Sequence, residues 1–266
     1  MRLRKLLIAV AALTIAVTAC GGDDVSSSST SAPVASAGEA EATGAVTVFA
    51  AASLTDAFNE VGEAFKAANP EASVTFNFAA SSALVTQINE GAPVDVYASA
   101  DEANMKKLTD AGNNGAAPVI FARNKLQIIV AKGNPKGIES VKDLIDPGLL
   151  VVNAAPEVPI GAYAQQVFDK AGITVTPVSL EANVKAVVTK VTAGEADAGI
   201  VYTTDVTAAG DRAEGVDIPD ELNVIATYPI ARTKEAPNAA AAEAFIEFVT
   251  GDEGQAILAE YGFAPK

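Results

Sequence analysis

Hydroxyl side chains stand at three points in this sequence where an apolar run gives way to a helical pattern. These side chains belong to Ser53, Ser81, Ser82 and Tyr202. Hydroxyl groups and the free N–H groups of a helix's first turn are hydrogen-bond donors, so together they could hold an anion. Each Ser could equally cap the helix that follows it, and Tyr202 could be a core residue with a locally satisfied hydroxyl. The pattern alone leaves these interpretations open.

The segment 156–163 adds backbone donors to this inventory. It reads Pro156-Glu157-Val158-Pro159-Ile160-Gly161-Ala162-Tyr163, a rigid turn that leads into a helix. Its first helical residues offer free N–H groups, and no cationic side chain accompanies them. A fully ionised oxyanion needs donors only, whereas a protonated ligand would need an acceptor. The inventory therefore favours an oxyanion as the partner.

The composition excludes most other functions. The 266 residues include no His and a single Cys, and 33 acidic against 18 basic side chains give a formal charge of −15. Without His there is no Ser-His-Asp triad and no usual zinc site, and one Cys forms no disulfide. The acidity argues against nucleic acid as a partner. Nucleotide-binding loops and hydrolase nucleophile motifs are absent, so we expect no enzyme and no cofactor.

The N-terminus indicates export. Residues 1–5 are basic and 6–19 are apolar or small, a stretch typical of a secretory signal peptide and too short to span a membrane comfortably. Val17-Thr18-Ala19-Cys20 resembles the bacterial lipoprotein cleavage box, which predicts lipid attachment at Cys20. An ordinary signal peptide with an incidental Cys is the alternative. Residues 20–44 then form a flexible tether, and the protein is anchored to the outer face of the cell membrane.

Strand-like and helix-like segments alternate through the rest of the chain. The expected strands are 45–50, 74–78, 94–98, 126–131, 149–152, 175–178, 198–202 and 222–226. The expected helices are 54–65, 84–88, 101–108, 161–171, 184–191, 238–250 and 253–261. This alternation predicts an α/β fold with mostly parallel sheets, divided into two lobes because about 220 residues are structured.

In these segments the sequence resembles the periplasmic molybdate-binding proteins of ABC transporters. The first marks are Val48-Phe49-Ala50-Ala51-Ala52-Ser53-Leu54, Phe78-Ala79-Ala80-Ser81-Ser82-Ala83-Leu84 and Gly91-Ala92-Pro93-Val94-Asp95-Val96-Tyr97-Ala98-Ser99-Ala100-Asp101. They continue with 156–164, Gly199-Ile200-Val201-Tyr202 and the ending Tyr261-Gly262-Phe263. Each mark is weak by itself, but together and in this order they are specific.

The resemblance implies a two-lobed periplasmic-binding-protein fold with two hinge crossings, the type II arrangement. Lobe one would comprise residues 45–123 plus 233–266, and lobe two would comprise 124–232. The protein would deliver its ligand to an ABC permease in the membrane. We expect it to act as a monomer.

The resemblance also implies the ligand and its contacts. Members of the family hold molybdate or tungstate with hydroxyls and backbone amides alone. Carried over to matching positions, these roles fall on the side chains and N–H groups of Ser53 and Ser81 and on the Tyr202 hydroxyl. The backbone N–H groups of Ile160 and Val184 complete the set, although the turn before Ile160 is one residue shorter than a common family version.

Three alternatives stay open at this point. The same fold could bind another oxyanion, such as sulfate or phosphate. The chain could be an exported α/β enzyme, which the missing His and nucleophile motifs disfavour. It could also be a structural or adhesive lipoprotein, which would bind no small ligand.

Overall fold

The structure is a computed structural model, and it describes residues 42–266. These residues belong to one compact unit. The expected signal peptide (1–19), the lipid attachment at Cys20 and the tether up to residue 41 lie outside the described residues. Within the described part, no helix is long and apolar enough to cross a membrane.

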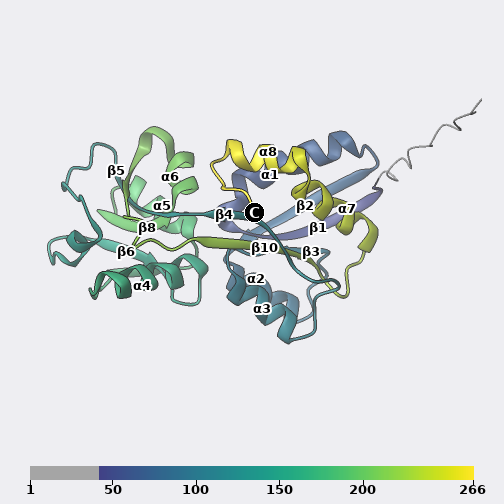
Figure 1. Ribbon diagram of the computed structural model, residues 1–266, viewed down its shortest axis with the longest axis horizontal. Coiled ribbons are helices and arrows are strands. Elements are labelled where there is room, and N and C mark those ends of the chain that lie inside the picture. The colour runs from purple at the N-terminus through teal and green to yellow at the C-terminus, as the bar shows by residue number, and fades with distance from the viewer. Residues whose placement is uncertain (1–41) are drawn as a thin grey trace, which may run out of the picture. The chain divides into compact units, whose positions relative to one another are not determined.

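The first lobe is built on a five-stranded sheet with the order β2-β1-β3-β10-β4. Its strands are β1 (Gly44–Ala51), β2 (Ala72–Ala79), β3 (Val96–Ala98), β4 (Val119–Asn124) and β10 (Ala226–Arg232). Its helical segments are η1 (Ala52–Leu54), α1 (Thr55–Ala68), α2 (Ser81–Asn89), α3 (Glu102–Asp110), α7 (Ala239–Thr250) and α8 (Asp252–Glu260). Helices α1, α7 and α8 lie on one face of this sheet, and α2 and α3 lie on the other (Figure 1).

The alternation of side chains along β1 explains why both faces are covered. Val46, Val48 and Ala50 belong to the larger apolar cluster with Phe58. Phe49, between them, belongs to a second cluster under α2 and α3. Because successive side chains of a strand point to opposite faces, an apolar strand such as β1 needs helices on both sides.

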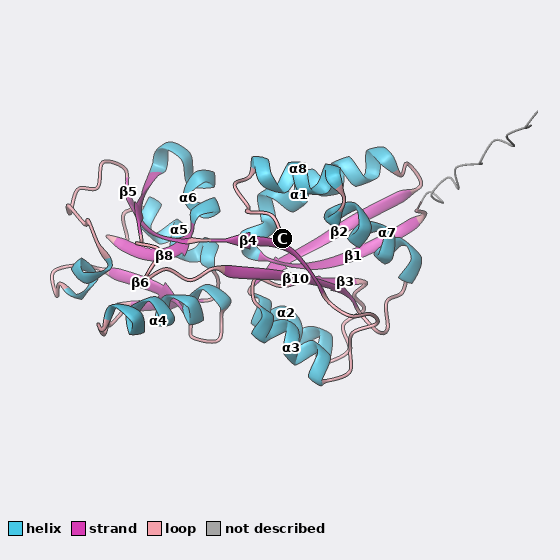
Figure 2. Ribbon diagram, in the orientation of Figure 1, coloured by secondary structure: helices cyan, strands magenta, loops and turns pink. Residues whose placement is uncertain are grey.

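The second lobe repeats the arrangement with a sheet of order β7-β6-β8-β5-β9. Its strands are β5 (Leu126–Ala131), β6 (Val151–Ala154), β7 (Ser179–Glu181), β8 (Ala198–Tyr202) and β9 (Ala213–Asp217). Its helical segments are η2 (Val141–Ile145), α4 (Pro159–Ala171), α5 (Val184–Thr192), α6 (Thr203–Ala209) and η3 (Gly210–Arg212). Figure 2 shows these helices grouped around the second sheet.

The chain crosses between the two sheets twice. It leaves the first sheet at Lys125, between β4 and β5, and returns between β9 and β10 (Figure 1). Asn223 ties the two crossings together, because its side chain accepts from the Leu126 N–H at 3.1 Å and donates to the Leu126 carbonyl at 3.0 Å. The expected two-lobed α/β fold with two crossings is therefore confirmed.

Two details of the expected fold are wrong. Residues 226–232, placed in lobe two, form β10 of the first sheet and pair with β3 and β4. The apolar residues around 222–226 resemble a strand in the sequence, but Asn223 holds them in the returning crossing. The second lobe therefore ends near residue 225.

The sheets are also mixed rather than mostly parallel. Strand β1 runs parallel to β2 and β3, and β6 runs parallel to β7 and β8. Strands β10 and β5 run antiparallel to both of their neighbours. Each of these two strands is the first one after a crossing between the sheets. The chain therefore enters the sheet from the side of the crossing, whereas the neighbouring strands run toward that side.

Several elements carried no clear sequence signal. Strands β4 and β9 and helix α6 were not predicted, and β7 lies a few residues after the expected 175–178. The β9 residues alternate between half-buried and exposed positions after the first, so this edge strand lacks an apolar run. By contrast, β8 matches the expected 198–202 because all five of its residues are buried.

Candidate oxyanion-binding site

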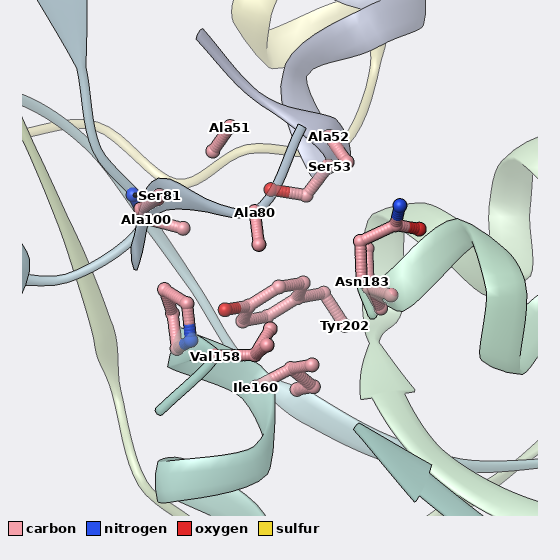
Figure 3. A pocket seen from close by; sticks show the side chains of 12 residues that line it. Ala51, Ala52, Ser53, Ala80, Ser81, Ala100, Val158, Ile160, Asn183 and Tyr202 are labelled. Atoms are coloured by element: carbon pink, nitrogen blue, oxygen red, sulfur yellow. Dashed lines mark hydrogen bonds between the residues drawn. The ribbon is translucent and has the colours of Figure 1, made fainter. Parts of the chain in front are cut away.

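A pocket lies between the two lobes, where strands end and helices begin. All five predicted ligand residues line it (Figure 3). The complete lining consists of Ala51, Ala52, Ser53, Ala80, Ser81, Ala100, Val158, Pro159, Ile160, Asn183, Val184 and Tyr202. The small Ala side chains allow a ligand to approach the backbone closely. Both lobes contribute, so the pocket exists only when they face each other.

Four helical segments start at this pocket. They begin at Ala52 (η1, continuing into α1), Ser81 (α2), Pro159 (α4) and Val184 (α5). The first three lack a side-chain cap, whereas the Asn183 side chain caps α5 by accepting from the Ala186 N–H at 3.0 Å. Uncapped first-turn N–H groups have no intrahelical acceptor, and the helix dipole places partial positive charge beside them. The converging ends therefore favour a bound anion.

The two serines do not cap these helices. The N-cap residues are Ala51 for η1 and Ala80 for α2, so the capping interpretation is wrong for both serines. Ser81 is fully buried, and its Oγ accepts from the Ala100 N–H at 3.0 Å. Ser53 Oγ lies 3.1 Å from the Tyr228 hydroxyl. Each serine hydroxyl is thus held by a protein group while it faces the pocket.

The Tyr202 hydroxyl has no hydrogen-bond partner among the described residues, although it is buried. Figure 3 shows its ring lying between Ser53 and Ala80 on one side and Val158 and Ile160 on the other. Burial raises the pKa of Tyr202 well above its ordinary value, so the phenol keeps its hydrogen. An unsatisfied buried donor costs about 1–3 kcal/mol, which a ligand oxygen would recover. The alternative of a locally satisfied core tyrosine is wrong.

No residue of the pocket lining carries a charged side chain. Lys185 follows Val184, but its Nζ lies 2.8 Å from Asp56 and 3.5 Å from Asp205. Asp56 belongs to α1 in the first lobe, whereas Lys185 and Asp205 belong to the second. Burial raises the pKa of Asp205 to about 6, against the opposing effect of Lys185. The Lys185–Asp56 salt bridge therefore joins the two lobes beside the pocket.

The pocket is small. Its volume is about 10 Å³, and a cavity that holds one water molecule needs about 10–15 Å³. Any larger ligand requires the lobes to separate, and a compact ion requires less separation than an amino acid or a sugar. Within residues 42–266, no group of three or more His, Cys, Asp or Glu side chains could hold a bare metal ion. The described arrangement therefore suits a small polyatomic anion.

Sequence reasoning missed three residues that shape the site. Asn183 caps α5, Ala100 N–H holds Ser81, and Tyr228 holds Ser53. The Asn before an apolar helix is a recognisable capping signal. Ala100 and Tyr228 gave no such signal, because they contact Ser81 and Ser53 across separations of 19 and 175 residues along the chain.

Residues 46–264 match the model of a family described as bacterial extracellular solute-binding protein. The chain belongs to this family of bacterial extracellular solute-binding proteins. Among curated relatives of this solute-binding protein, the molybdate-binding protein ModA of Mycobacterium tuberculosis is 42% identical over 254 residues, covering 96% of this chain and 95% of the relative. ModA of Escherichia coli is 33% identical over 233 residues, covering 84% and 90%.

Solved structures agree on the fold of this solute-binding protein. The periplasmic molybdate-binding protein of Azotobacter vinelandii superimposes with a TM-score of 0.73 at 22% identity, covering 83% of this chain and 99% of that one. The sulfate-binding protein SubI of Mycobacterium tuberculosis gives 0.74 at 21% identity, covering 83% and 86%. At these identities the superpositions support the two-lobed fold and leave the solute to other arguments.

Proposed function

We propose that this solute-binding protein captures molybdate, and tungstate, between its lobes and delivers it to an ABC permease. The observation that carries the proposal is the pocket itself, which offers the unpartnered Tyr202 hydroxyl, two serine hydroxyls and helix N-termini without any charged side chain. Relatives at 42% and 33% identity are named molybdate-binding proteins. Together these findings favour molybdate over other solutes.

In the proposed complex, the oxyanion accepts hydrogen bonds from both lobes. Ser53 and Ser81 donate with side chain and N–H group from the first lobe. Tyr202 donates with its hydroxyl, and Ile160 and Val184 with their N–H groups, from the second lobe. Dipoles of this kind stabilise a dianion without a counter-ion when water is excluded. The protein needs no cofactor for this role, because it binds and releases its ligand without chemical change.

The proposed cellular setting follows from the N-terminus. After cleavage before Cys20, a lipid on that residue would hold the protein at the outer face of the membrane. A relative from Bacillus subtilis, 27% identical over 268 residues, is named a putative ABC transporter substrate-binding lipoprotein. The tether would keep a monomeric protein near its permease and raise the effective concentration for docking.

Sulfate is the second candidate, and one observation favours it. A sulfate-binding protein of Synechococcus elongatus is 27% identical over 295 residues, and it covers 96% of this chain. Sulfate and molybdate share charge and tetrahedral shape, so the donors described here recognise both. The small cavity has to discriminate between them by size.

Calorimetric titration of the purified protein with molybdate, tungstate, sulfate and phosphate tests the proposal. We expect one molybdate or tungstate per chain and much weaker binding of sulfate. Ser53→Ala or Ser81→Ala should each weaken molybdate binding by about 1–3 kcal/mol, because each loses a hydrogen bond to a charged group. Ser140→Ala is a matched control, because Ser140 is the N-cap residue of η2 in the second lobe, outside the pocket lining. Unchanged molybdate affinity in both pocket variants would exclude the assigned site.

A further inference from the structure

Tyr228 does not line the pocket, yet its hydroxyl reaches a residue that does. It is fully buried in β10, and its ring packs against Phe121, Tyr202 and Phe263 with centroid distances of 6.2, 5.8 and 5.4 Å. The pairing of β10 with β4 shifts register between Tyr228 and Pro229. Such irregularities often redirect a side chain beside a functional site. The hydroxyl lies 3.1 Å from Ser53 Oγ.

The surroundings of the two hydroxyls determine which of them donates. Ser53 Oγ is the hydrogen-bond partner of the Tyr228 hydroxyl, and the distance alone allows either group to donate. If Ser53 donated, the buried phenol hydrogen of Tyr228 would have no acceptor among the described residues, which is costly. If Tyr228 donates, the hydrogen of Ser53 stays available to a ligand in the pocket that Ser53 lines.

The direction of the Tyr228–Ser53 hydrogen bond determines where the Ser53 hydrogen points. The hydrogen of the Tyr228 hydroxyl therefore goes to Ser53 Oγ. Burial raises the pKa of Tyr228 well above its ordinary value, so that hydrogen is retained. Ser53 Oγ, having accepted from Tyr228, turns its own hydrogen toward the pocket. Ser81 Oγ likewise accepts from the Ala100 N–H, so the Ser81 hydroxyl hydrogen is also free to point into the pocket.

We infer that Tyr228 is a positioning residue that fixes Ser53 as a hydrogen-bond donor, so that the pocket prefers oxyanions without a hydrogen over hydrogen-bearing ones of equal charge. The inference rests on the proposed function and extends it to selectivity. Hydrogen phosphate carries two negative charges, like molybdate, together with one hydrogen. In a pocket of donors that hydrogen finds no acceptor, and a buried unsatisfied donor is costly.

The Tyr228→Phe variant tests this role. Phe keeps the ring packing and removes the donor to Ser53, whose lone pair then becomes free to accept the hydrogen of hydrogen phosphate. We expect molybdate binding to weaken by about 3- to 10-fold through poorer positioning of Ser53. We expect the preference for molybdate over hydrogen phosphate to fall by about tenfold or more. Both quantities come from direct molybdate titration and from competition with phosphate at about pH 8.

Tyr97→Phe is the matched control. Tyr97 is also fully buried in the first lobe, but its hydroxyl donates to the Ser81 carbonyl oxygen, at 2.9 Å, rather than to a serine hydroxyl. Its loss should leave the molybdate-to-phosphate preference unchanged. A double-mutant comparison adds a second check: once Ser53→Ala has removed the serine hydroxyl, Tyr228→Phe should no longer change the preference.

The outcomes separate the inference from the proposed function. A lowered preference in Tyr228→Phe, absent from Tyr97→Phe and from the Ser53→Ala background, supports the role of Tyr228. An unchanged preference in Tyr228→Phe, or an equal change in Tyr97→Phe, overturns it while molybdate binding by the unaltered protein stands. Failure of the unaltered protein to bind any of the oxyanions overturns the proposed function instead.

Discussion

At the scale of single residues, the chemistry of this protein depends on donors whose acceptors are missing. The hydroxyl of Tyr202 has no partner among the described residues. The hydroxyls of Ser53 and Ser81 each contact one protein group and can donate their own hydrogen to the pocket. Their types and their positions after strands were visible in the sequence. The orientation of the serine hydroxyls could not be predicted from the sequence. It depends on Ala100, which follows β3, and on Tyr228, which lies in β10.

Replacing Tyr202 with Phe separates binding from stability. Tyr202→Phe should weaken molybdate binding by about 1.5–3 kcal/mol, because a hydrogen bond to a charged oxygen is lost. The unfolding free energy of the ligand-free protein should not fall, since the hydroxyl has no protein partner. Calorimetric titration and urea unfolding measure the two quantities.

The control for this substitution is Tyr261→Phe. Its hydroxyl donates to Glu60 at 2.7 Å, outside the pocket lining, so molybdate binding should be unaffected. Equal molybdate affinities for Tyr202→Phe and the unaltered protein would remove Tyr202 from the site.

At the scale of elements, strand ends and helix starts place the donors. The apolar runs of β1 and β8 and the helix periods of α1 and α5 are strong signals, and the sequence predicts them well. The position of strand β10 could not be predicted from the sequence. Residues 222–226 resemble a strand, but Asn223 binds Leu126, 97 positions earlier, and shifts the strand toward the first lobe. No local pattern encodes a contact over that separation.

Helix α6 supplies a prediction on pH. The Asp205 pKa is raised to about 6 in the folded protein, chiefly by burial. The unfolded chain therefore loses this proton at lower pH than the folded one, and the contribution of Asp205 to stability falls as pH rises from about 4 to about 6. Asp205→Asn removes this loss and keeps an acceptor for the Tyr202 N–H, which Asp205 Oδ2 bonds at 3.2 Å.

Urea unfolding at several pH values checks this prediction. The unfolding free energy of the unaltered protein minus that of Asp205→Asn should decrease by about 3 kcal/mol across this pH window. A difference that stays constant, or one that increases with pH, would contradict the assigned environment of Asp205.

At the scale of the whole molecule, two lobes meet around one pocket, and Lys185 joins them. It bonds Asp56 of the first lobe at 2.8 Å and Asp205 of the second at 3.5 Å. The family motifs predicted two lobes and two crossings, because motifs preserve topology. They gave no indication of the Lys185–Asp56 pair, since lysines and aspartates at least partly exposed to solvent are frequent on an acidic surface.

Lys185→Met should loosen lobe closure. The Lys185–Asp56 pair bridges the lobes, and pairs with exposed partners such as these contribute about 0.2–1 kcal/mol, so molybdate binding should weaken by less than about tenfold. Small-angle scattering should show a larger radius of gyration for the ligand-free variant and an unchanged one with molybdate bound. Lys106→Met is the control, because Lys106 pairs with Asp110 inside α3 of one lobe. Identical scattering curves for Lys185→Met and the unaltered protein, both without ligand, would contradict the role of this pair.

A thermal melt of the purified protein with each oxyanion tests whether this protein binds molybdate. At about 1,000 times the dissociation constant, a ligand specific to the folded state adds about 4 kcal/mol of stability. For a protein of this size, the midpoint should rise by roughly 8–16 °C. We expect this rise with molybdate and tungstate only. A rise with sulfate or phosphate alone would contradict the assigned solute, and no rise with any of the four would contradict the binding function.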